Sequence, residues 1–203
     1  MSLQTRIRAA LLLVVLAMSA AAGVILWNQN QLQESFDLLN TTTRLDDFLM
    51  ESRRQEKNFL LRKDKASVAA FNASYDSLFF LTNRLAASVE THMLQDTLDR
   101  LIDREDRYRS TFNQLVQLTR TKNPSARLAK RIETQIVKFA RECHSIIDAI
   151  REIASQQFRQ TRSTTHMVNI AALVIGILLS VLIAGVLADR AIRGWEQQEG
   201  DVG

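Results

Sequence analysis

Two carboxylates fall where a helical chain would place apolar side chains, and they are the first candidates for chemistry. Glu56 and Glu105 each lie on a stripe of apolar residues that repeats along their segment. Paired carboxylates can perform general acid–base catalysis, but the surrounding sequence supplies no nucleophile, second base or oxyanion site. A buried carboxylate must be paired or protonated. We therefore expect Glu56 and Glu105 to be structural, at the edge of the stripe or paired with an arginine of a neighbouring helix, and we predict no enzyme.

Cysteine and histidine offer little further chemistry. Cys143 is the only cysteine, which excludes an intramolecular disulfide and any CxxC site. It lies on an apolar stripe, so we expect a small core hydrophobe; an intermolecular disulfide is the alternative. His92, His144 and His166 lack the spacing of metal ligands. The sequence predicts neither a metal site nor a cofactor.

The elements that must hold these residues are long helices. The 203 residues include only 6 Gly and 1 Pro, and a chain so poor in helix breakers favours helix throughout. Apolar positions recur at alternating spacings of three and four, which keeps one stripe facing partner helices, as in antiparallel bundles. The four series are Leu38, Leu45, Phe48, Ser52, Glu56, Phe59; Val68, Phe71, Tyr75, Leu78, Thr82, Leu85, Val89; Leu94, Leu98, Leu101, Glu105, Tyr108, Phe112, Leu115; and Ile132, Ile136, Phe139, Cys143, Ile146, Ile150, Ile153.

Three breaks separate these series. The first is residues 62–65, with Asp64 as the expected N-cap. The second is weakly marked, between Ser88 and Asp96, and the third, residues 121–125, contains the single proline. Four helices with three short connections predict an all-α fold: an antiparallel up-down-up-down four-helix bundle flanked by two transmembrane helices.

Two uncharged apolar stretches, residues 9–27 and 167–188, are the predicted membrane spans, because each is close to the roughly 20 residues needed to cross a bilayer. Arginines precede the first stretch and follow the second, so the positive-inside rule places both termini in the cytoplasm. These arginines are Arg6, Arg8, Arg190 and Arg193. The predicted parts are a cytoplasmic N-terminus (1–8), the first span (9–27), a periplasmic bundle (28–166), the second span (167–188) and a short cytoplasmic tail (189–203).

The first stretch has an alternative interpretation as a cleaved signal peptide. Ala20, Ala21 and Ala22 resemble a cleavage site, and a basic region precedes the stretch. The apolar run continues past this site to Trp27, an aromatic residue suited to the outer interface. We therefore favour an uncleaved anchor.

The net charge of +4 does not indicate a nucleic-acid partner. Basic residues alternate with acidic ones, as in the run from Arg104 to Arg107, and such mixing is typical of a solvated helix face.

Two short motifs resemble those of a known family. Residues 53–62 read RRQEKNFLLR, similar to a stretch near the end of the first periplasmic helix in bacterial methyl-accepting chemotaxis proteins and sensor histidine kinases. Residues 108–116, YRSTFNQLV, resemble a pattern of a later helix in the same sensor domains. The order of anchor, helical bundle and anchor also matches. The resemblance implies a homodimeric periplasmic sensor in the inner membrane, which binds a small organic or amino acid and shifts its last helix.

The resemblance also points to a ligand site on the first bundle helix. Leu45, Ser52 and Phe59 should face the bundle, whereas the opposite face, which carries Met50, Arg54, Lys57 and Leu61, suits the same helix of a second copy. Related receptors bind anions in this region, and guanidinium groups match carboxylates through paired donors. The expected ligand-binding residues are Arg53, Arg54, Lys57 and Arg62. The alternative is that these are surface charges, with Glu56 as an internal ion-pair partner.

The chain departs from the family at its C-terminal side. Residues 189–195 resemble the entrance of a HAMP domain, with Gly194 where proline is usual, and only a short polar tail follows. A shortened receptor and a sensor that acts through a partner both remain open. The sequence therefore predicts a ligand-sensing, chemoreceptor-type domain in the membrane, and the alternative is a helical interaction module that acts through a cytoplasmic or membrane partner without a small ligand.

Overall fold

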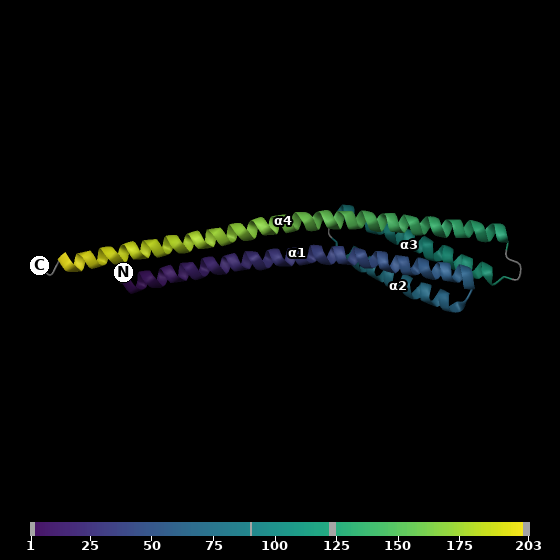
Figure 1. Cartoon of the computed structure of the whole chain (residues 1–203), viewed down its shortest axis with the longest axis horizontal. Coiled ribbons are helices and arrows are strands. Elements are labelled where there is room, and N and C mark those ends of the chain that lie inside the picture. Colours follow the sequence, from purple (N-terminus) through teal and green to yellow (C-terminus); the bar gives the residue numbers. More distant parts are fainter. Residues whose placement is uncertain (1–2, 90, 122–124, 201–203) are drawn as a thin grey trace. The chain divides into compact units, whose positions relative to one another are not determined.

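The structure, a computed structural model, describes residues 3–89, 91–121 and 125–200, and describes side chains at residue 8 and over 11–89, 91–121 and 125–186. The described chain consists of helices and short connections (Figure 1). The helices are α1 (Leu3–Arg62), α2 (Lys65–Ser88), α3 (His92–Thr119) and α4 (Ala126–Gly200). The prediction of an all-helical fold with four helices is confirmed.

The first predicted break lies where the sequence placed it. Lys63 adopts a left-handed conformation, with φ of 54°, and its N–H donates to the carbonyl of Phe59 at 2.8 Å. This geometry closes α1, because a left-handed residue after a helix satisfies one of its free carbonyls. Asp64 then caps α2, since its Oδ1 accepts the N–H of Ser67 at 2.6 Å.

The other two breaks also agree with the sequence. α2 ends at Ser88 and α3 begins at His92, inside the weakly marked interval. Between α3 and α4, residues 122–124 lie outside the described residues, and Pro124 is among them. Ser125 precedes α4, and its Oγ accepts the N–H of Leu128 at 3.4 Å, as an N-cap does.

The chain divides into two compact units. One consists of Met1–Glu34 and Arg159–Gly203, which we call the apolar unit. The other is Ser35–Phe158, which we call the bundle unit. The helices α1 and α4 contribute residues to both units.

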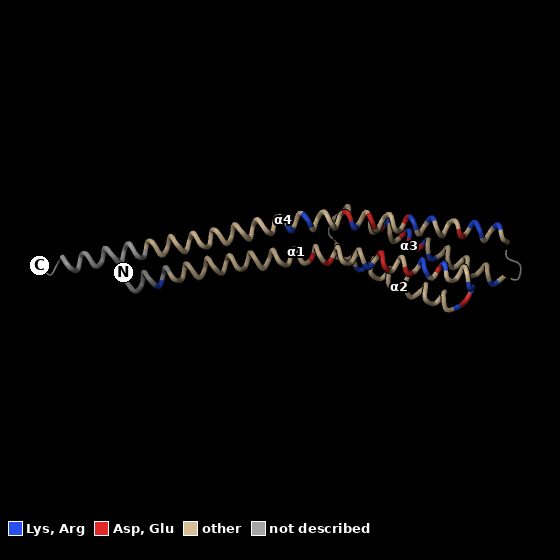
Figure 2. The backbone as a smooth tube through the Cα atoms, viewed as in Figure 1, with Lys and Arg blue, Asp and Glu red and all other residues tan. Residues whose placement is uncertain are grey.

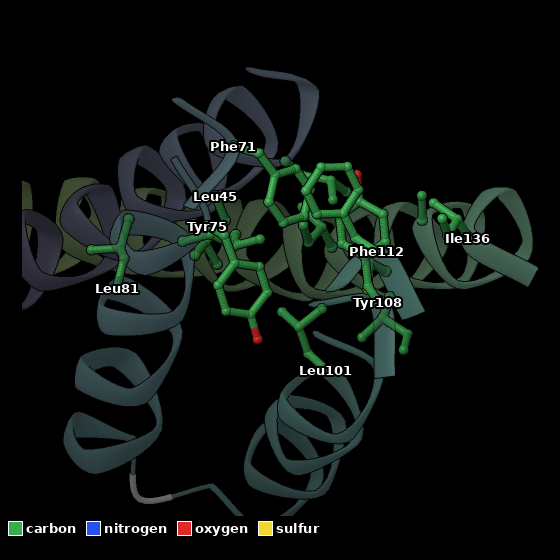
Figure 3. Close-up of a cluster of buried hydrophobic side chains, with 14 of the residues drawn as sticks. Leu45, Phe71, Tyr75, Leu81, Leu101, Tyr108, Phe112 and Ile136 are labelled. Carbon is green, nitrogen blue, oxygen red and sulfur yellow. The ribbon is translucent and has the colours of Figure 1, made fainter. Parts of the chain in front are cut away.

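The bundle unit is built around one hydrophobic core to which all four helices contribute (Figure 3). At its centre the rings of Phe71 and Phe112 stack with their centroids 3.8 Å apart, and Phe59 meets Phe112 edge-on at 5.5 Å. Such ring pairs add to the hydrophobic gain from burial.

The predicted stripes form this core. Every member of the four series is buried or half-buried, which confirms that the repeat marks the interior face. Leu49 and Ile147 are fully buried although they lie beside the predicted series, because a bundle helix buries a face wider than one stripe.

The apolar unit exposes its large apolar side chains. The described parts of α1 and α4 in this unit are long and apolar enough to cross a membrane. Figure 2 shows these parts almost without charged residues, in contrast to the bundle helices. Inside the unit, Asn28 Nδ2 donates to Asn169 Oδ1 at 3.3 Å, which joins α1 to α4. An exposed apolar surface of this kind is consistent with a membrane protein.

Candidate functional site

The basic segment, which we define as Arg53, Arg54, Lys57 and Arg62, lies near the end of α1. Arg53 is half-buried, and the other three side chains are exposed. Arg54 already contacts a carboxylate one turn earlier, since it donates to Glu51 at 2.9 Å. An exposed pair of this kind contributes little to stability. The segment therefore concentrates positive charge, most of it at the surface, and its expected role in ligand binding stays a prediction.

Glu56 is the first buried carboxylate, with 3% of its surface exposed. Its Oε2 accepts a hydrogen bond of 2.8 Å from the hydroxyl of Tyr108. Burial raises the pKa of Glu56, and this effect outweighs the hydrogen bond from Tyr108 and the positive charges of Arg53 and Lys57, which lower it.

Glu105 is the second buried carboxylate and is fully buried. The hydroxyl oxygen of Thr82 lies 2.7 Å from Glu105 Oε1 and 3.1 Å from the carbonyl of Leu78. One hydroxyl hydrogen cannot serve both acceptors. Both contacts are satisfied when Glu105 carries a proton and donates it to Thr82, which then donates to Leu78.

The electrostatics of the core favour the same protonated state. Burial raises the pKa of Glu105 to about 8, against a lowering by the Thr82 hydrogen bond and a further increase from the charge of Asp106. The second oxygen of Glu105, Oε2, is buried without a hydrogen-bond partner. An ionised carboxylate in that position would be costly, so the fold favours the protonated, neutral form of Glu105.

Two further polar groups lie in the same part of the core. The hydroxyl of Tyr75 is buried without a partner, and the guanidinium of Arg109 lies 4.8 Å from the centre of its ring. Burial raises the pKa of the Cys143 thiol. A neutral, buried thiol is unreactive, so Cys143 is the core hydrophobe that the sequence predicted.

The hydrogen-bond partners of the two carboxylates are not the arginines that the sequence predicted. Within the described residues the hydrogen-bond partners are hydroxyl groups, Tyr108 for Glu56 and Thr82 for Glu105. Neither carboxylate lies at the edge of its stripe, since both are buried. Both carboxylates thus have hydroxyl partners, and their expected structural role stays a prediction.

A polar cluster that the sequence reasoning missed joins α1 to α4 within the bundle unit. Asp46 of α1 lies 3.0 Å from Nδ1 of His144 and accepts a hydrogen bond of 2.9 Å from Arg151. Asp148 contacts the same two residues from α4 itself, at 3.4 and 2.9 Å. The spacing of His144, Asp148 and Arg151 by four and three residues was the available signal for a charged helix face. This spacing does not indicate that Asp46 of α1 is their partner.

The bundle unit also has an open cleft between α3 and α4, of about 470 Å³, which we call the glutamine cleft. Its described lining combines polar side chains with the apolar side chains of Leu118, Leu128 and Ile132. Its lining residues are Gln114, Gln117, Leu118, Thr121, Leu128, Arg131, Ile132 and Gln135. A second hollow of similar size along α3 shares Gln114 and Gln117 and adds Asp106, Arg109, Ser110 and Asn113. Four of these residues, Arg109, Ser110, Asn113 and Gln114, belong to the YRSTFNQLV motif, which was singled out from the sequence but given no role in binding.

Among the described residues, no group of three or more His, Cys, Asp and Glu is placed to hold a metal ion. The chain matches no protein-family model, no curated protein and no solved structure. The resemblance to bacterial sensor domains therefore rests on the two motifs and on the order of the segments.

Proposed function

We propose that the chain is a membrane-anchored sensor of the chemoreceptor type, which binds a small extracellular molecule and transmits a helix shift across the bacterial inner membrane. The supporting observation is that α1 and α4 each combine, in one helix, an apolar stretch fit to span a membrane with residues of the buried core. A change in core packing therefore acts on the same two helices that contain the spans.

The proposed topology is an antiparallel up-down-up-down bundle outside the membrane, with both termini in the cytoplasm. The connections after α1 and α2 are only a few residues long, and short connections favour antiparallel neighbours. Four helices then return the chain to the side from which it left. The flanking arginines support the cytoplasmic placement of the termini.

The proposed mechanism is a ligand-biased two-state shift of α4. A ligand changes a helix equilibrium only if it binds the two arrangements with different affinity. The contacts of Asp46 with His144 and Arg151 hold α1 and α4 in one arrangement within the bundle unit. A second arrangement of the two helices would replace these contacts with others. Small piston-like or rotational displacements of this kind are a common switching motion.

The active form in this proposal is a homodimer. Met50 and Leu61, on the outward face of α1, are 53% and 82% exposed, and Arg54 and Lys57 share that face. Large exposed apolar residues beside charged ones suit a partner helix. An anion site on the basic segment would need the second copy, since most of its side chains are exposed in one chain.

The experiment uses the full chain in lipid nanodiscs. Melting followed by circular dichroism is recorded with a panel of organic acids and amino acids, each at 1 mM. A ligand at 100 times its dissociation constant should stabilise the folded form by about 2.7 kcal/mol and raise the melting temperature. The same ligand should change the rate of disulfide formation between copies that carry Leu178→Cys in a Cys143→Ala background. A panel without effect on either measurement would contradict direct sensing.

A second candidate function is a helical module that binds another protein without a small ligand. The observation that favours it is the exposure of Phe80 on α2 and Met93 on α3, both 67% exposed and both away from the outward face of α1. Crosslinking in native membranes discriminates the two. One stoichiometric protein partner, together with no ligand response, would favour the interaction module.

A further inference from the structure

We propose that the glutamine cleft is a binding site for a small organic carboxylate that carries further hydrogen-bonding groups. This inference rests on the proposed sensing function, because it identifies the ligand class and the place where that ligand acts. It assigns the site to α3 and α4 of one chain, and so differs from an anion site on the basic segment of α1.

The polar side chains of the cleft have unused hydrogen-bonding capacity. Gln114 and Gln117 come from α3, and Arg131 and Gln135 from α4. The side chains of all four are exposed, and none of them makes a hydrogen bond or ion pair with another described side chain. Elsewhere in the bundle unit, Gln55 and Asn83 donate to nearby oxygens at 2.7 Å. The amides of the cleft are thus available to a ligand.

The residue types define what the cleft would bind. A guanidinium offers paired donors that match the two oxygens of a carboxylate, and among the described residues that line the cleft Arg131 is the charged one. Each glutamine supplies both a donor and an acceptor, which suits a hydroxyl, amide or ammonium group. Ile132 is a core residue and Leu118 packs against the core, so the floor accommodates a short carbon skeleton.

The charge around the cleft favours an anion. Arg107 and Arg109 pair with Asp103 and Asp76, but the described residues 110–121 and 125–132 contain Arg120, Arg127, Lys130 and Arg131 and no Asp or Glu, with Glu133 as the next acidic residue on α4. Figure 2 shows the Lys and Arg of this run at the start of α4. A region with one sign of charge raises the local concentration of the oppositely charged ligand.

Occupation of the cleft would act on the signalling helix directly. Its walls come from α3 and from the first turns of α4, so a ligand that bridges them favours one relative position of the two helices. α4 is the helix that contains the second apolar stretch.

The test is calorimetric titration of the full chain in nanodiscs with succinate, L-malate and L-glutamate, with the neutral diamide succinamide as the charge control. At least one carboxylate should bind, and succinamide should not.

Arg131→Ala should weaken binding at least tenfold, since a hydrogen-bonded charge pair is lost, and Gln117→Ala should weaken it several-fold. Arg127→Ala is the matched control, because Arg127 lies one turn earlier on α4 and does not line the cleft; it should leave the affinity within about twofold, because a surface charge outside the site contributes little.

Two results would overturn the assignment. One is that none of the three carboxylates binds the unmodified chain. The other is that Arg131→Ala and Arg127→Ala have the same effect. If a carboxylate binds and only Arg54→Ala weakens it, the cleft is wrong while the sensing proposal stands. If binding depends on Arg131 but leaves the Leu178→Cys crosslinking rate unchanged, the cleft is right and the sensing proposal fails.

Discussion

The two buried carboxylates occupy equivalent positions in the helical repeat, yet their surroundings differ. Glu56 accepts a hydrogen bond from the Tyr108 hydroxyl, and the positive charges of Arg53 and Lys57 act on it. Glu105 interacts with a hydroxyl that is already needed by a backbone carbonyl, and its second oxygen has no partner. Arg109 contacts the ring of Tyr75 and the carboxylate of Asp76.

The difference shows that burial alone does not define the state of a core carboxylate. Burial raises the pKa of both groups, but at Glu56 two cations and a phenol oppose it. At Glu105 only the Thr82 hydrogen bond opposes it, and Asp106 adds to it. Glu105 therefore destabilises the fold more than Glu56 does. Replacement of Glu105 with a neutral side chain should raise the free energy of unfolding more than the same replacement at Glu56.

The largest expected effect is on the pH dependence of stability. The folded-state pKa of Glu105 is raised from its ordinary 4.5 to about 8, so the folded chain binds more protons than the unfolded chain between these values. The contribution of protonated Glu105 to the free energy of unfolding is complete below about pH 4.5. It is lost as the pH rises towards 8, which lowers the stability of the chain by up to about 5 kcal/mol. Glu105→Gln should remove this part of the slope and stabilise the chain at pH 7 by up to about 3 kcal/mol.

Urea unfolding of the full chain in detergent micelles, followed by circular dichroism from pH 4.5 to 8.5, measures this effect. Glu56→Gln is the matched control and should flatten the slope less. Equal slopes for the unmodified chain and Glu105→Gln would show that Glu105 is ionised in the fold and would remove the contrast between the two carboxylates.

The next effect concerns the two buried tyrosines. Tyr108→Phe deletes the donor to Glu56 and leaves a buried carboxyl group without that partner, which should cost about 1–3 kcal/mol. Tyr75→Phe deletes a hydroxyl that has no partner, so it should be neutral or stabilise the chain by up to about 1 kcal/mol. The urea midpoints of the two variants at pH 7 test this order. A Tyr75→Phe variant as unstable as Tyr108→Phe would mean that the Tyr75 hydroxyl makes an important hydrogen bond.

The smallest effect sharpens the contrast within the basic segment. Arg54 pairs with Glu51 at an exposed position, so Arg54→Ala should change the free energy of unfolding by less than about 0.5 kcal/mol. Arg53→Ala should have a larger effect that depends on pH, because Arg53 lowers the pKa of the buried Glu56. The free energies of unfolding of both variants, measured at pH 5 and pH 8, test this difference. Identical behaviour at the two pH values would mean that Arg53 does not act on Glu56.

Much of the fold could be predicted because the signals are local. The alternation of three and four marks a buried stripe within a single helix, and it identified Glu56 and Glu105 as core residues before any helix was placed. Asp64 could be identified as a cap because its role needs only the three residues that follow. Most contacts of the candidate site could not be predicted in this way, because they join different helices. The repeat does not reveal which residue of one helix lies at the same height as a residue of another, so hydroxyl partners were mistaken for arginines.

The sequence by itself determined the helices, their breaks, the interior stripes and the two apolar stretches, because each depends on residues less than a few turns apart. The tertiary structure alone decided that Tyr108 faces Glu56, that Thr82 faces Glu105 and that Asp46 meets His144. It also brought Gln114 of the YRSTFNQLV motif and the first turns of α4 together around the glutamine cleft. These pairings depend on the axial register between helices, which arises from the packing of all four helices around one core.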